Sequence, residues 1–293
     1  MTALPGGSPA LRLAPRPLGR TGLSATPLAL GGLAIRGAAP PAPGLSPEDV
    51  ERAFHEHGVN TFFVTRHMTA LAEGVRRLVR AGHREELTLV SAASLPFGWA
   101  VRGAWEKNAR ALGVDSIDVW LLGWVRARWH VRGGTWRAMR RLKEEGKVRA
   151  LGFSCHDRIL AAELARELAV DVLMIRYNAA HRGAEREIFE SLGPGCPPVI
   201  SYTATRWGML LVPLPEHGFP NALTAPECYR FVLAHPGVGV ALCAARSYQE
   251  IRDDVAGVLA GPLPPDRYEE ARRFGDAVHA AARGGFRWMF RQG

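Results

Sequence analysis

Short apolar runs alternate with longer amphipathic stretches along most of the chain. Eight of these runs have the length of buried strands, and helical patterns lie between them. The expected strands lie near residues 30–34, 59–63, 87–92, 117–122, 150–154, 172–177, 199–202 and 238–243. Strands that alternate with helices predict β-α units and a parallel sheet. We therefore expect an α/β fold, a closed (β/α)8 TIM barrel.

The segments before and between these strands carry recognisable boundary residues. Ser46, followed by a proline and two acidic residues, is typical of a helix N-terminus, and Gly58 is typical of its end. Residues 18–29 predict a short N-terminal β-hairpin. Residues 1–15, rich in Pro, Gly and Ala, are expected to form a flexible tail. The remaining residues, 16–293, are then one barrel domain.

Two connections depart from the regular pattern. Residues 125–134 are rich in Trp, Arg and His, and residues 209–226 carry four prolines. Loops that follow the strands of such a barrel form its active face, so both are candidate lids or pocket walls. The alternative is that they are plain surface connections.

The composition narrows the classes of function. The net charge is +9, but basic residues are interspersed with acidic ones, which favours a mixed-sign surface over nucleic-acid binding. No apolar run reaches the length of a membrane span. The four cysteines show no C-x-x-C spacing, so we expect no disulfide framework, no zinc site and a cytoplasmic location.

Six segments in the right order resemble the aldo-keto reductase family and together cover nearly the whole chain. They are 16–32 (RPLGRTGL with LALGG), 58–60 (GVN), 84–86 (REE), 112–118 (LGVDSID), 145–154 (EGKVRALGFS) and 236–247 (PGV with ARS). The resemblance implies the barrel fold and reduction of carbonyl groups by NADPH without a metal. In that family a Tyr donates the proton, a Lys paired with an Asp lowers the pKa of the tyrosine, and a His orients the substrate.

The same resemblance implies that all four catalytic positions are replaced. Phe63 stands at the position of the Asp, Met68 at that of the Tyr, Ala92 at that of the Lys and Gly123 at that of the His. None of the three lysines is expected at a strand end, and no tyrosine precedes residue 177. Loss of a positioned general acid typically costs about 10²–10⁴ in rate. Ordinary carbonyl reduction should therefore be very slow.

On the cofactor side the resemblance is partial, so it leaves NADP(H) binding open. Cys155 and Met174 replace the Asn and Gln that hold the nicotinamide carboxamide. Acids also stand where the family contacts adenine with Gln and Asn. The positions that match the family's cofactor contacts are Ser154, Tyr202, Thr203, Arg206, Arg246, Ser247, Glu250 and Asp254.

Polar residues that follow the strands are candidates for a replacement chemistry. They are Arg66, His67, His156, Arg176, Tyr177 and Asn178. Arginines suit a carboxylate or phosphate, and His67 or His156 titrates near neutral pH. Strand alternation, however, puts Arg176 and Asn178 on one side and Tyr177 on the other, so one set packs against helices. His156 also fits the N-terminal region of the next helix.

Two functions follow from these observations. The first is an atypical or repurposed enzyme, an NADP-dependent oxidoreductase by resemblance, that acts on a polar or anionic small molecule. The second is a non-catalytic pseudoenzyme that binds a nucleotide or a protein partner. The sequence does not set the substrate, the reaction or the oligomeric state.

Overall fold

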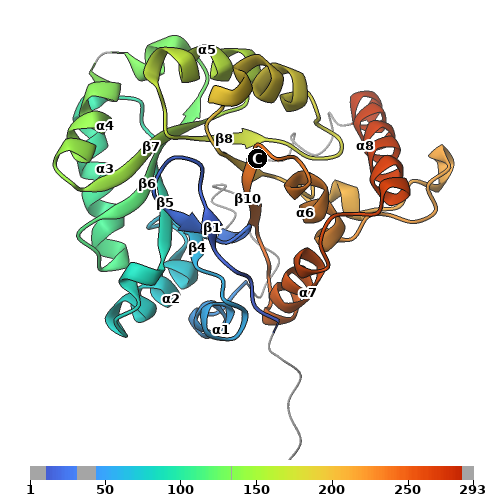
Figure 1. Cartoon of the computed structure of the whole chain (residues 1–293), viewed down its shortest axis with the longest axis horizontal. Coiled ribbons are helices and arrows are strands. Elements are labelled where there is room, and N and C mark those ends of the chain that lie inside the picture. The colour runs from blue at the N-terminus through green and yellow to red at the C-terminus, as the bar shows by residue number, and fades with distance from the viewer. Residues whose placement is uncertain (1–10, 32–43, 133, 286–293) are drawn as a thin grey trace, which may run out of the picture.

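Eight parallel strands form a closed barrel, which confirms the expected (β/α)8 fold (Figure 1). The structure, a computed structural model, describes residues 11–31, 44–132 and 134–285. Around the barrel the strands follow one another in chain order, and β10 pairs with β3 to close it. The strands are β3 (Leu28–Gly31), β4 (Thr61–Phe63), β5 (Thr88–Ala93), β6 (Ile117–Val125), β7 (Val148–Cys155), β8 (Val172–Arg176), β9 (Val199–Tyr202) and β10 (Val238–Cys243).

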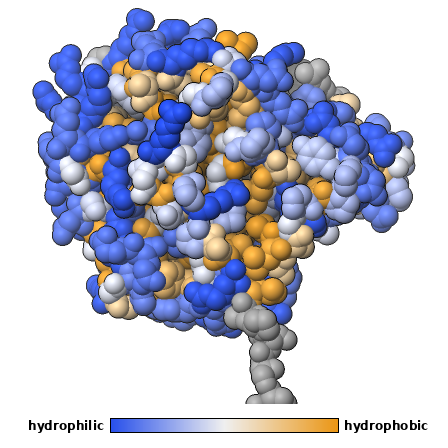
Figure 2. All heavy atoms as spheres, viewed as in Figure 1, coloured by the Kyte–Doolittle hydropathy of each residue, from blue (hydrophilic) through white to orange (hydrophobic). Residues whose placement is uncertain are grey.

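Helices surround the strands, with α8 at the periphery (Figure 1). They are α1 (Pro47–His57), α2 (Thr69–Arg80), α3 (Gly98–Leu112), α4 (Thr135–Glu144), α5 (Arg158–Leu168), α6 (Ala225–Leu233), α7 (Tyr248–Leu259) and α8 (Pro265–Gly285). The predicted ends of α1 are present: Ser46 forms a capping box with Asp49, and Gly58 closes the helix at φ 69°. Hydrophilic residues cover most of the rim in the space-filling view (Figure 2).

The N-terminal segment differs from the prediction. The hairpin strands are β1 (Arg16–Pro17) and β2 (Ser24–Ala25), whereas residues 28 and 29 already belong to β3. Residues 32–34 of the expected first strand and residues 1–10 of the expected tail lie outside the described residues. Leu13 is buried, and its N–H donates to the carbonyl of His57 at 2.8 Å. This part of the expected tail is therefore anchored to the barrel.

Side chains alternate between the inside of the barrel and the surrounding helices. Along β6, Val119 and Leu121 belong to the inner cluster, while Trp120 packs with the residues that face the helices. Leu18 and Leu23 of the hairpin join the inner cluster. The hairpin thus fills the N-terminal end of the barrel, so that space for a ligand remains at the C-terminal end.

Asp118 on β6 is a buried acid on which the barrel wall depends. It is 1% exposed, accepts a hydrogen bond from the backbone N–H of Leu89 (2.8 Å) and pairs with Arg84 (3.1 Å). Asp118→Ala leaves the N–H of Leu89 without a partner and removes the carboxylate that balances the charge of Arg84, and we expect the free energy of unfolding to fall by about 3–5 kcal/mol. Denaturant unfolding measures the loss. Arg149→Gln, which removes only an exposed partner 3.5 Å from Asp118, is the control and should cost under about 1 kcal/mol.

Candidate functional site

A cavity of about 1000 Å³ opens at the C-terminal ends of the strands. Its floor consists of one inward-facing residue from each strand. These are Gly31, Phe63, Ala92, Gly123, Ser154, Met174, Tyr202 and Leu242. Only Ser154 and Tyr202 among them carry polar side chains. Barrels of this type hold their ligand sites at this face, so the cavity is the candidate functional site.

The four positions that match the family's catalytic residues carry no ionisable side chain. Phe63, Ala92 and Gly123 lie in the cavity floor. Met68 precedes α2, is 8% exposed and packs in the hydrophobic core outside the cavity lining. Their equivalence to the catalytic positions stays a prediction. Their chemistry in this structure is apolar.

One lysine reaches the cavity by a route that the sequence analysis missed. No lysine stands at a strand end, but Lys107 lines the cavity wall from α3, beside Asn108. Asn108 is 4% exposed, and its Oδ1 accepts the backbone N–H of Arg66 at 2.7 Å. An amine and an amide thus border the cavity from a helix, where attention to strand ends alone could not find them.

Ser154 on β7 has a hydrogen to donate to a ligand. Its Oγ accepts the backbone N–H of Trp124 at 2.8 Å, which leaves the hydroxyl hydrogen free to point elsewhere. Trp124 has a left-handed backbone (φ 53°) and an indole that is 47% exposed in the cavity wall. The strained residue and the serine therefore hold each other in place at the edge of the floor.

Tyr202 and His156 form a hydrogen-bonded pair in the cavity lining. The hydroxyl oxygen of Tyr202 lies 3.1 Å from His156 Nδ1. Burial raises the pKa of Tyr202, whereas burial and the charge of Arg176 lower the pKa of His156. Both side chains are therefore neutral near pH 7. The resemblance assigns a stacking role to Tyr202, and this hydrogen bond was not foreseen.

The structure separates the other strand-end candidates. Arg66 and His67 are exposed and line the cavity. Tyr177, in contrast, is fully buried on the outside of the barrel, where its hydroxyl donates to Glu185 at 2.9 Å. Asn178 is also fully buried and belongs to a loop network outside the lining. Tyr177 and Asn178 are therefore not in place to meet a cavity ligand, because the strand alternation and the local turn direct them elsewhere.

At the end of the cavity near α7, Arg246 forms an ion pair with Glu250. The resemblance matches Arg246 to a phosphate-contacting position. The guanidinium of Arg246 donates to Glu250 Oε1 at 3.0 Å, and the backbone N–H of Arg246 donates to the same carboxylate at 2.8 Å. Ser247, outside the lining, caps α7. Asp254 is 4% exposed, accepts the thiol of Cys243 at 3.1 Å, and has its pKa raised to about 7 by burial.

The loop after β9 follows an unusual backbone path. Thr203, Arg206 and Trp207 all have positive φ angles, at 55°, 51° and 53°. Thr203 and Trp207 line the cavity. Arg206, expected to add charge to this loop for a phosphate, is 6% exposed and outside the lining, because the left-handed turn directs its side chain inward. Of the two irregular connections, residues 209–226 contribute to the wall, whereas residues 125–132 and 134, the described part of the other connection, do not.

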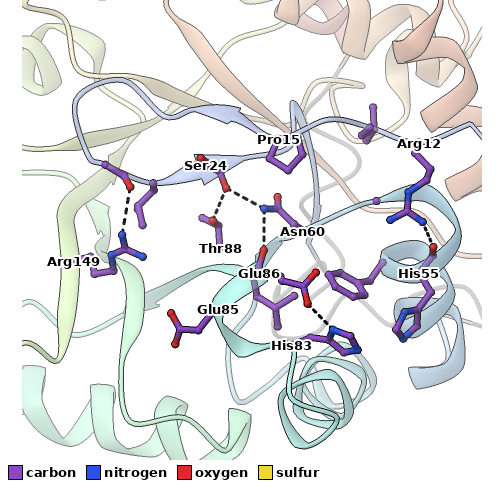
Figure 3. Close-up of a pocket in the computed structure, with 16 residues that line it drawn as sticks. Arg12, Pro15, Ser24, His55, Asn60, His83, Glu85, Glu86, Thr88 and Arg149 are labelled. Carbon is purple, nitrogen blue, oxygen red and sulfur yellow. Dashed lines mark hydrogen bonds and ion pairs between the residues drawn. The ribbon is translucent and has the colours of Figure 1, made fainter.

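A second pocket, of about 810 Å³, lies at the N-terminal end of the barrel (Figure 3). Its polar groups bond one another: the carbonyl of Ser24 accepts Asn60 Nδ2 (3.0 Å) and Thr88 Oγ1 (2.8 Å). His83 pairs with Glu86 at 2.7 Å in the same way. This face of a barrel generally serves stability, so the cavity at the other end remains the candidate.

The described residues contain no group of three or more side chains that could hold a metal ion. Among them, too, no helix is long and apolar enough to cross a membrane.

The fold and the cavity define a (β/α)8 barrel with a ligand site at its C-terminal face. Residues 100–211 match the model of the aldo/keto reductase family, so this segment of the barrel is similar to that family. The resemblance predicted from the sequence is thereby confirmed for this segment.

Solved structures agree on the fold. The holo form of aldo-keto reductase AKR11C1 from Bacillus halodurans aligns with a TM-score of 0.73 at 20% identity, over 91% of this chain and 96% of that one. A proposed aldo-keto reductase from Pseudomonas aeruginosa aligns with a TM-score of 0.65 at 21% identity, over 85% and 95%. No curated protein sequence matches.

Proposed function

We propose that the chain is an atypical oxidoreductase that binds NADP(H) and a polar or anionic small molecule in the cavity at the barrel mouth. One observation carries this proposal. Six of the eight positions that match the family's cofactor contacts line the same cavity: Ser154, Tyr202, Thr203, Arg246, Glu250 and Asp254. They extend from the barrel floor across β9 to the start of α7.

The residues present fit a nicotinamide at one end. Ser154 has a hydroxyl hydrogen to donate to a carboxamide, and the ring of Tyr202 lies in the floor beside it. Met174 offers a thioether in place of an amide, so the grip is weaker than in the family. A bound NADPH would supply the hydride.

The proton would have to come from the cavity wall, since the floor carries no ionisable group besides Tyr202. His67, His156 and Lys107 all line the wall, and Arg66 is available to an anionic group. We propose His67 and His156 as the groups that exchange the proton, because both imidazoles line the cavity wall and an imidazole nitrogen can donate or accept a proton.

The choice between NADPH and NADH provides a test of the cofactor site. Glu250 occupies the guanidinium and the backbone N–H of Arg246, the donors that a 2′-phosphate would use. Glu250→Gln removes the competing charge, and we expect NADPH binding to tighten about tenfold or more while NADH binding stays unchanged. Fluorescence titration of both nucleotides measures the change.

Asp253→Asn is the matched control for this test. Asp253 is an exposed acid on the same helix and accepts Gln249 rather than Arg246. Equal tightening in both variants would indicate a general effect of net charge. Absence of saturation by either nucleotide, in the wild type and in Glu250→Gln alike, would refute the cofactor site.

A second candidate function is a non-catalytic protein that binds a nucleotide or a partner. The apolar side chains at Phe63, Met68, Ala92 and Gly123 favour it. It predicts saturable nucleotide binding with no NADPH oxidation by any carbonyl compound. Oxidation that depends on His67 or His156 would exclude it.

A further inference from the structure

A group of basic side chains gathers at the ends of β7 to β9, next to the cavity. Arg158 pairs with Glu187 at 2.5 Å. Within the described residues, the side chains of Arg176 and Arg206 have neither a hydrogen bond nor an ion pair, and no aromatic ring lies under either guanidinium. Two arginines, one at the end of β8 and one in the loop after β9, thus have no partner among the residues that the structure describes.

Arg206 is largely withdrawn from water, and Arg176 is partly withdrawn. Arg206 is 6% exposed, and its Nη1 is inaccessible and unbonded. Arg176 is half-buried, with Nε inaccessible and unbonded. Burial lowers the pKa of each, and the charge of Arg176 lowers that of Arg206 further. Buried polar groups are normally satisfied, and buried charges are normally paired, so this arrangement lacks a component of opposite charge.

Hydrogen bonds of the backbone around Arg206 hold its side chain in the buried position. Arg206 adopts φ 51°, and its N–H donates to the carbonyl of Thr203 at 2.8 Å. The same carbonyl accepts Asn178 Nδ2 at 2.7 Å. The buried asparagine thereby fixes the turn that directs the guanidinium inward, while the neighbouring Trp207 stays 45% exposed. A left-handed backbone at a non-glycine residue costs free energy, and such strain concentrates at ligand sites.

We propose that Arg176 and Arg206 together bind one oxyanion group, a carboxylate or a phosphate, between the ends of β8 and β9. Planar guanidinium groups match the paired oxygens of both classes. Arg176 lies opposite Tyr202 in the pairing of β8 with β9, and Tyr202 lines the cavity, so the bound group adjoins the cavity. The assignment of this group as the anionic end of a cavity ligand rests on the proposed function. The anion site itself does not.

Inorganic sulfate tests the site without any cofactor. Its charge is constant over the working pH range, and sodium chloride of equal ionic strength corrects for screening. The melting temperature of the wild type should rise more in sulfate than in chloride, because sulfate binds the folded state. Arg176→Gln and Arg206→Gln should each weaken sulfate binding by about tenfold or more. Arg140→Gln, at an exposed position on α4, is the matched control and should keep the full effect.

A second readout comes from His181, which lies beside the two arginines. Burial and the charges of Arg176, Arg206, His279 and Arg158 lower the pKa of His181 to about 3. Sulfate at the proposed site offsets part of this positive charge, so the pKa of His181 measured by NMR should rise. Sulfate bound elsewhere would leave it unchanged, and this readout needs no variant that might fail to fold.

The proposal is overturned if sulfate stabilises the wild type no more than chloride, if both arginine variants keep the sulfate effect, or if the pKa of His181 does not move. Phosphate and acetate in place of sulfate then identify the class of the bound group. Tighter binding of phosphate supports a phosphate ester, and tighter binding of acetate supports a carboxylate. NADPH titration in chloride is an independent measurement. Absence of saturation by NADPH would refute the cofactor proposal, and the evidence from sulfate for the anion site would still stand.

Discussion

Purified protein supplied with saturating NADPH and a simple aldehyde should turn over at least about a hundredfold more slowly than a conventional aldo-keto reductase assayed beside it. The reason lies in the floor of the cavity. Phe63, Ala92 and Gly123, which the resemblance matches to the catalytic Asp, Lys and His, present a ring, a methyl group and a hydrogen atom to the cavity. NADPH oxidation followed by absorbance measures the rate.

The control for this experiment is Tyr202→Phe, since Tyr202 bears the floor's one phenol. We expect this variant to be slow as well, because burial raises the pKa of Tyr202 and, among the described residues, no cation bonds its hydroxyl. Fast oxidation in the wild type that is lost in Tyr202→Phe would contradict the prediction. It would show that a phenol on β9 replaces the missing proton donor.

The barrel could be predicted from the sequence because its signal repeats. Each strand buries both faces, so apolar runs mark all eight of them, and capping residues such as Ser46 and Gly58 mark helix ends. Boundaries were less certain. β6 extends to Val125, three residues beyond the expected end, because pairing with β7 resumes after an irregularity at residues 122–125. The local pattern of apolar and polar residues does not determine where the pairing of two strands resumes after an irregularity.

The cavity floor could also be predicted in part, because a two-residue period decides which strand-end side chains point inward. That period places Ala92, Gly123 and Ser154 in the floor. It could not reveal Lys107, which reaches the cavity from a helix, or the inward turn of Arg206, which depends on a left-handed backbone. Both positions depend on tertiary packing, which the spacing of residues along the sequence does not reveal.

Asp254 gives the folded protein a pH dependence that a single substitution should remove. Burial raises its pKa from 3.8 to about 7, so the folded state holds a proton that the unfolded state releases. The stability from this group is complete below pH about 4 and is lost as the pH rises to about 7. At about 1.4 kcal/mol per pH unit, the loss is on the order of 4 kcal/mol.

Asp254→Asn is neutral throughout this range and still accepts the thiol of Cys243. Its free energy of unfolding should equal that of the wild type near pH 4 and exceed it by up to on the order of 4 kcal/mol at pH 8. Urea unfolding at a series of pH values measures the difference, with Asp253→Asn, at an exposed site, as the control. Parallel profiles for Asp254→Asn and the wild type would mean that Asp254 is ionised in the folded protein. A charged acid at this end of the cavity would then repel a nucleotide phosphate at neutral pH, and the cofactor site would lose its main support there.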